Sequence, residues 1–146
     1  MRSSSLAIGS GLRLPWRAQR QALRALSWLV AADLAVRLLP YANVLRLLDR
    51  IPANRRGNAA LSPADCAIAI RRAARVYPLA RCLARAVAAS CMLCRAGRRV
   101  VPSLGVGFDQ GRRFEAHAWL ECDGVMITGG EEAARFAPLR ATSKDA

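Results

Sequence analysis

The spacing of apolar residues changes at Gly97, and this change limits the folds open to the chain. Before Gly97, apolar residues recur at spacings of three and four, which predicts helices. After it, β-branched and apolar residues alternate between turn signals, which predicts strands. Helices followed by an antiparallel meander make an α+β fold. With 146 residues the chain has the size of one domain.

The first half divides into segments of different composition. Residues 1–14 are rich in Ser, Gly and Arg and are interpreted as a loose N-terminal arm. Residues 15–50 form an N-terminal helical segment, with a long helix from Pro15 to about Leu39 and a short one over 43–48. We expect the apolar stripe of the long helix to cover the core; it comprises Leu23, Leu26, Val30, Leu34 and Leu38. Residues 51–61 are the predicted linker, and 60–141 the predicted core.

Two more helices and a hairpin follow the linker. Ser62 and Pro63 predict a helix start, and this helix should end near Val76 because Pro78 disfavours helical geometry at the preceding residue. The next helix should start near Pro78 and end at Gly97. Strands are then expected over 100–108, 114–122 and 125–128, with Asp123-Gly124 as a tight hairpin turn and Gly129-Gly130 ending the last strand.

The charge favours anionic partners. The formal net charge is +13, and nearly all the cations are arginines, scattered along the chain. Nucleic acid, phospholipid headgroups and acidic peptides all suit such a field. Dense basic clusters with interleaved aromatics are missing, which counts against nucleic acid. No stretch reaches the ~20 apolar residues of a membrane span, although peripheral membrane contact stays open. With no secretory signal and an odd number of cysteines, a reducing cytoplasm is expected.

The chain has one histidine, His117. Strand alternation puts it on one face with Trp119, between Glu115 and Glu121, and puts the apolar neighbours on the other face. An imidazole beside a Trp and two carboxylates is unusual for a face that only packs. His117 is therefore a candidate catalytic base.

Of the five cysteines, Cys82 has the setting that most favours a thiolate. It lies near the start of a predicted helix, whose unpaired N–H groups and dipole stabilise an anion, and Arg81 and Arg85 add positive charge. The other four fall inside predicted helices or on a core face, where Cys behaves as a small hydrophobe: Cys66, Cys91, Cys94 and Cys122. Cys91 and Cys94 form a C-x-x-C pair in mid-helix without a second ligand pair, so no metal or cofactor is expected.

Several segments resemble one known family. The segment from Tyr77 to Ala86, with its Cys-Leu-Ala-Arg-Ala, looks like the "C-L-x-R-S/A" helix of the lasso-peptide biosynthesis B2 proteins. Residues 98–107 resemble their next strand, and 114–124 are very similar to their "AHAW(V/L)E-x-DG" segment. Residues 135–139 resemble their C-terminal ending.

The resemblance implies a transglutaminase-like cysteine-protease fold and removal of the leader peptide from a lasso-peptide precursor. Cys82 would be the nucleophile and His117 the base, within hydrogen-bonding reach of each other. The partners implied are the precursor, a separate leader-binding recognition protein and a macrolactam synthetase.

The third member of the family's Cys-His-Asp arrangement stays open. Gly129 or Gly130 is expected opposite His117, and we expect neither to orient an imidazole. Asp123 lies in the turn, and Glu121 and Glu131 are alternatives. Two other functions also stay open: acyl transfer to an amine at the same Cys-His site, and a non-catalytic basic protein that binds nucleic acid or membrane.

Overall fold

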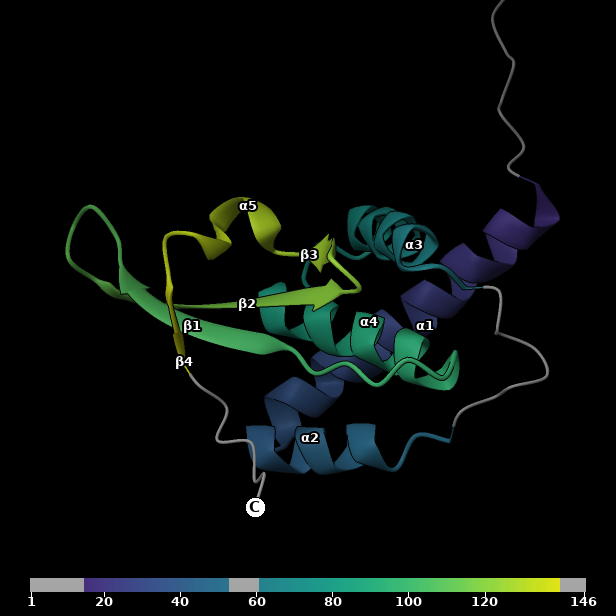
Figure 1. The fold of residues 1–146 in the computed structure, drawn as a ribbon, viewed down its shortest axis with the longest axis horizontal. Coiled ribbons are helices and arrows are strands. Elements are labelled where there is room, and N and C mark those ends of the chain that lie inside the picture. The colour runs from purple at the N-terminus through teal and green to yellow at the C-terminus, as the bar shows by residue number, and fades with distance from the viewer. Residues whose placement is uncertain (1–14, 53–60, 140–146) are drawn as a thin grey trace, which may run out of the picture.

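A computed structural model describes residues 15–52 and 61–139 of the chain. The predicted arm over 1–14 and most of the predicted linker lie outside the described residues. Within them, four helices precede the sheet, as Figure 1 shows: α1 (Trp16–Leu38), α2 (Tyr41–Asp49), α3 (Pro63–Val76) and α4 (Cys82–Arg95). The predicted order of helices followed by an antiparallel sheet is confirmed.

The sheet has four antiparallel strands in the order β3-β2-β1-β4. These are β1 (Ser103–Phe108), β2 (Phe114–Cys122), β3 (Val125–Thr128) and β4 (Ala137–Leu139). The hairpin turn forms as predicted, with φ of 52° at Asp123 and 75° at Gly124. The first strand begins at Ser103 and not at Val100, because Pro102 has no N–H to donate to the ladder. The sequence did not predict β4 or the short helix α5 (Gly130–Ala133) that follows β3.

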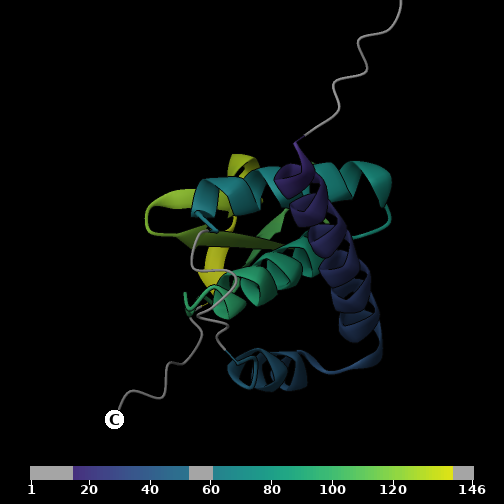
Figure 2. The same ribbon diagram turned by 90° about the vertical axis from the view of Figure 1, so that its right-hand side faces the viewer.

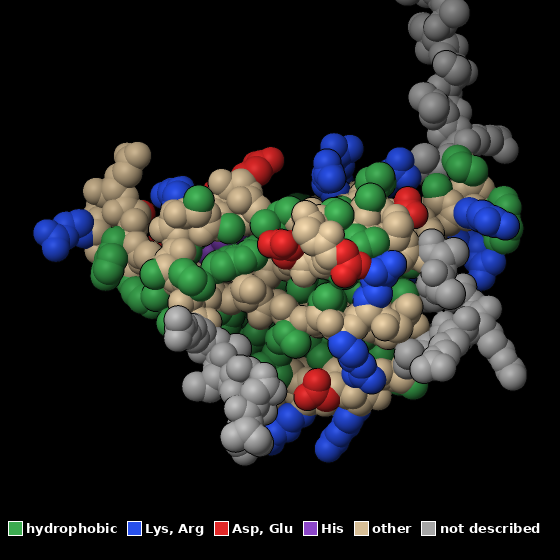
Figure 3. Space-filling view, in the orientation of Figure 1, with side chains coloured by type: hydrophobic (Ala, Val, Ile, Leu, Met, Phe, Trp, Pro, Cys, Tyr) green, Lys and Arg blue, Asp and Glu red, His purple; other side chains and the backbone are tan. Residues whose placement is uncertain are grey.

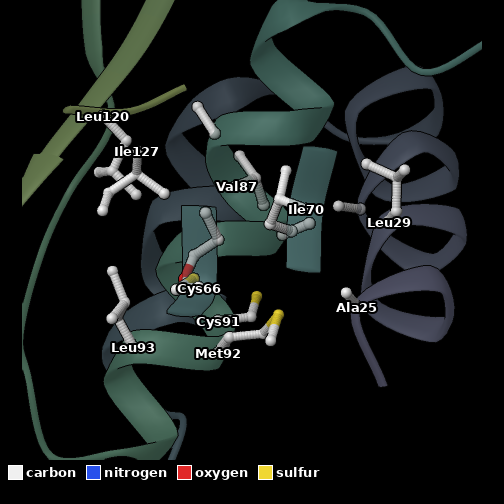
Figure 4. Packing of buried hydrophobic residues seen from close by; sticks show 14 of the residues in the cluster. Ala25, Leu29, Cys66, Ile70, Val87, Cys91, Met92, Leu93, Leu120 and Ile127 are labelled. Carbon is white, nitrogen blue, oxygen red and sulfur yellow. The ribbon is translucent and has the colours of Figure 1, made fainter. Parts of the chain in front are cut away.

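The helices α1 and α3 and the sheet surround α4. Ten residues of α4 are buried, most of them small, so neighbouring elements approach it closely. Figure 2 shows α1 running across α3 and α4. Figure 4 shows Leu120 and Ile127 pointing from the sheet into the same cluster as Val87, Ile70 and Leu29.

The prediction for the core face of α1 is wrong for three of its five residues, while Leu26 packs against the core and Val30 is half-buried. Leu23, Leu34 and Leu38 are exposed, whereas Ala25, Leu29 and Ala32 are buried. The helix packs through two alanines and Leu29 against the alanine-rich surfaces of α3 and α4. The apolar stripe read from spacing therefore lies largely on the outside of the molecule.

The start of α3 and the end of α4 are set by local sequence. Ser62 caps α3: the N–H of Asp65 donates to its Oγ at 3.0 Å, and the Ser62 hydroxyl donates to the Asp65 carboxylate at 2.8 Å. After α4, Gly97 has φ of 85°, and the N–H of Arg98 donates to the carbonyl of Leu93. This left-handed stop turns the chain back toward β1.

Candidate active site

Cys82 is the first residue of α4. The sequence predicted that the helix would begin near Pro78, but Pro78 and Leu79 form a turn and Arg81 is the N-cap residue. Cys82 therefore lies at the very start of the helix and not one turn inside it. Its position is among the unpaired N–H groups, where the helix dipole favours an anion most strongly.

A buried carboxylate holds the chain just before this helix. Asp33 of α1 is almost fully buried, and its Oδ2 accepts hydrogen bonds from the Tyr77 hydroxyl and from Arg37 Nε, both at 2.9 Å. Burial raises the pKa of Asp33, but the two hydrogen bonds outweigh it and the net shift is downward. Tyr77 ends α3, five residues before Cys82, so this network fixes the start of the connection to the thiol.

A second contact fixes the end of that connection. Arg85 Nε donates to the carbonyl oxygen of Ala80 at 2.9 Å, and Ala80 is buried. The turn before Cys82 is thus tied both to α1 and to the first turn of α4. These contacts define the position of the thiol on the protein.

Cys82 is also the only cysteine of the five that is not buried. Burial raises the pKa of Cys66 and of Cys91 to about 12, and it raises the pKa of Cys122 as well. The C-x-x-C pair lies in the interior of α4, with both thiols in the core. Among the described residues no group of three or more His, Cys, Asp or Glu could hold a metal ion.

His117 lies in the middle of β2, and its ring is held by the chain that follows β3. The carbonyl oxygen of Gly129 lies 2.9 Å from Nε2. A carbonyl only accepts, so Nε2 carries the hydrogen and the neutral ring has its lone pair on Nδ1. The expectation that neither glycine could orient an imidazole is wrong. The backbone carbonyl of Gly129 orients the ring by accepting its hydrogen bond, a role that was expected of a side-chain carboxylate.

Two aromatic rings and a glycine on the neighbouring strand shape the space around His117. Its ring stacks on Phe136 at a centroid distance of 5.0 Å and lies 6.3 Å from that of Trp119. Its partner on β1 is Gly105, where an added Cβ would lie 2.7 Å from Trp119 and 2.8 Å from Phe136. Gly105 therefore makes room for the aromatic side chains that enclose the imidazole.

The acidic side chain that faces the ring is that of Glu132. Its Oε2 lies 3.8 Å from His117 Nδ1, the atom with the lone pair. Of the acids predicted from the sequence, Asp123 pairs with Arg98, and neither Glu121 nor Glu131 has a contact with His117 among the described residues. Glu132 was missed because α5 is only four residues long and has no pattern that reveals which side faces β2.

The expectation that the thiol of Cys82 and the imidazole of His117 lie within hydrogen-bonding reach is not met, because the structure joins them by no hydrogen bond. In the described part of the chain Cys82 Sγ has no hydrogen-bond partner, and the two ring nitrogens face Gly129 and Glu132. Strand alternation places Ala118 and Leu120 in the core cluster with α4 and turns His117 and Trp119 toward Phe136 and α5. β3 pairs only with Leu120 to Cys122, so its ladder ends before His117.

The family of the chain follows from a comparison with family models. Residues 26–141, from the middle of α1 to beyond β4, match the model described as the transglutaminase-like superfamily. The chain belongs to the transglutaminase-like superfamily. This superfamily includes cysteine peptidases and acyltransferases, and its members are typically cysteine-dependent enzymes. No curated protein matches the chain, and no solved structure does.

The match to the transglutaminase-like superfamily takes in both the helix that begins at Cys82 and the strand that carries His117. It also takes in Gly129 and Glu132. Within the described ranges no helix has both the length and the apolar character that crossing a bilayer requires.

Proposed function

We propose that this transglutaminase-like protein is a cysteine peptidase that removes the leader peptide from a lasso-peptide precursor. The observation that supports the chemistry is the presence, within one matched domain, of a single accessible thiol at a helix start and a single imidazole whose tautomer is set by a backbone carbonyl. The choice of precursor rests on the resemblance of residues 77–86 and 114–124 to the leader peptidases of lasso-peptide biosynthesis.

In the proposed reaction His117 Nδ1 takes the thiol proton of Cys82, and the thiolate attacks the carbonyl carbon at the junction of leader and core. The C–N bond then breaks, the amine leaves with the proton from His117, and the leader stays on Cys82 as a thioester. Water, giving its proton to Nδ1, attacks the thioester and releases the leader as a free acid. The thiol is restored, so each cycle consumes one water molecule.

Glu132 and Gly129 have separate parts in this reaction. The Gly129 carbonyl keeps Nε2 protonated, and so keeps the lone pair of the neutral ring on Nδ1. The negative charge of Glu132 stabilises the positively charged imidazolium that forms after proton transfer. The proposal also requires Cys82 Sγ to come within hydrogen-bonding distance of Nδ1 when the precursor binds, since catalytic hydrogen bonds often tighten only in the substrate complex.

A cleavage assay tests the proposal. Purified protein, a lasso precursor and a separate leader-binding protein are mixed in water without an added amine, and the products are identified by mass spectrometry. We expect free leader acid from the wild type and at least about a thousand-fold slower cleavage by Cys82→Ala and by His117→Ala. Cleavage retained in either variant would remove that residue from the reaction.

The same assay separates hydrolysis from acyl transfer, which also occurs in the superfamily. When an amine is added, a peptidase still yields mainly leader acid. An acyltransferase instead joins the leader to the amine and yields little acid, and this result would contradict the proposed hydrolysis.

A further inference from the structure

One exposed face of α3 carries an arginine-lined pocket. Arg71, Arg72 and Arg75 line it together with Ile68, and its volume is about 150 Å³. The spacing of three, four and seven residues from Ile68 brings all four side chains onto one face of the helix. Figure 3 shows arginine side chains (blue) above α3.

These arginines have no acidic partner within the described residues. No salt bridge joins any of them to a carboxylate, and the one acid of α3, Asp65, is bonded to Ser62 at the far end of the helix. Arg75 lies four residues from Arg71 and three from Arg72, at helical spacings where like charges repel each other. A bound anion would relieve this repulsion.

The arginines are not needed to fold the helix. α3 packs through a separate face that contains Cys66, Ile70 and Ala73, all buried. The Ser62 cap holds its start. The basic face is therefore available to a partner.

Exposed apolar residues lie on this helix and along the chain between it and the candidate nucleophile. Ile68 is 44% exposed, Val76 72% and Leu79 65%. Leu79 lies in the turn that comes three residues before Cys82. The chain from this helix to the thiol therefore offers a partner both positive charge and exposed apolar side chains.

We propose that this face of α3 binds an acidic peptide segment with apolar side chains, the part of the precursor's leader that precedes the cut. Carboxylates pair with the guanidinium groups, for which arginine has the matching planar geometry, and an apolar side chain lies on Ile68. A peptide suits the face better than nucleic acid, because no aromatic side chain lines the pocket on which a base could stack. The identity of the segment rests on the proposed peptidase function.

Binding can be measured without cleavage. The protein is the full chain with Cys82→Ala, and the probe is a fluorescein-labelled peptide of mixed Glu and Leu, followed by fluorescence anisotropy. Its counterpart with every Glu replaced by Gln tests the charge. A single-stranded oligonucleotide with the same label tests the competing class of partner.

The test variant combines Arg71→Gln, Arg72→Gln and Arg75→Gln. The control combines Arg46→Gln, Arg50→Gln and Arg113→Gln, which removes the same charge from exposed positions elsewhere. We expect the α3 variant to weaken binding of the acidic peptide about ten-fold or more and the control about two-fold or less. Should the triple variant not fold, Arg71→Gln and Arg75→Gln are measured singly, with about a two- to four-fold loss expected for each.

Three results would overturn the inference. The two triple variants could weaken binding equally, which would mean that only the overall charge attracts the peptide. The Gln peptide could bind as tightly as the Glu peptide, or the oligonucleotide could bind through α3 while the peptide does not. Because the protein is Cys82→Ala throughout, these outcomes are independent of whether the wild type cleaves a precursor.

Discussion

The imidazole of His117 is held by a backbone atom, the carbonyl oxygen of Gly129, at 2.9 Å from Nε2. Gly129 has φ of 74°, and a Cβ on it would lie 2.6 Å from the carbonyl oxygen of Ala118 and 3.0 Å from His117 Nε2. The absence of a side chain at this position therefore lets the carbonyl approach the ring. It also explains why no carboxylate on the strand after His117 is needed to set the tautomer.

We predict that Gly129→Ala lowers the cleavage rate at least about ten-fold, because the added methyl group displaces the ring that Gly129 positions. Gly124→Ala is the matched control. Its φ is 75°, but nothing lies within 4 Å of its added Cβ, so it costs only the backbone strain of about 1–2 kcal/mol. Rates and urea unfolding are measured for both. Equal loss of activity in the two variants would mean that strain alone is responsible.

Glu132→Gln should slow cleavage by about two- to five-fold, because it removes an exposed charge 3.8 Å from Nδ1 and such pairs contribute about 0–1 kcal/mol. Glu131→Gln removes a neighbouring exposed charge that does not contact the ring, and its rate should match that of the wild type. The effect of Glu132→Gln should also shrink as salt is added. If both substitutions slowed cleavage equally, the loss of rate would be due to the overall negative charge of α5 and not to the contact between Glu132 and His117.

Because of Asp33, the free energy of unfolding should fall at acidic pH. Its pKa in the folded chain lies below the reference value of 3.8, so its ionised form stabilises the fold above that pH. This contribution is lost as the pH falls below 3.8 and through the lower folded value. In urea unfolding from neutral pH down to about pH 2.5, the stability gap between wild type and Asp33→Asn should narrow as the pH falls. A gap that stays constant across this range would contradict the pairing with Tyr77 and Arg37.

Replacing Leu29 tests which face of α1 is packed. Leu29 is fully buried, so Leu29→Ala should reduce the free energy of unfolding by about 2–5 kcal/mol. Leu23 is 65% exposed, and Leu23→Ala should change it by less than about 0.5 kcal/mol. Chemical unfolding of the two variants gives both numbers. A larger loss of stability from Leu23→Ala than from Leu29→Ala would mean that the leucine stripe, and not the face with Leu29, packs against the core.

The sequence predicted the elements better than it predicted their faces. Ser62, Gly97 and Asp123-Gly124 are local signals that need no tertiary partner, and each forms as expected. The core face of α1 could not be read in this way. Alanines pack closely against α3 and α4 beside Leu29, so the spacing of leucines alone does not mark the buried side of the helix.

The site was predicted only in part for a similar reason. Cys82 and His117 stand out by residue type and by position in a helix or strand, which the sequence contains. Gly129 acts through its backbone, and Glu132 lies on a short helix whose direction depends on the left-handed geometry at Gly129. Neither feature has a side-chain signature. The relative position of thiol and imidazole depends on how α4 crosses β2, which spacing along the chain does not determine.

The proposed peptidase requires Cys82 and His117 to act as a pair, and alkylation of the thiol measures this directly. Cys82 is the one thiol that is not buried, so iodoacetamide should label it selectively. With precursor bound, the proposed contact between imidazole and thiol favours the thiolate, so the labelling rate of the wild type should then exceed that of His117→Ala at least about ten-fold. Equal rates for the two proteins, both free and with precursor bound, would contradict the pairing and with it the proposed peptidase.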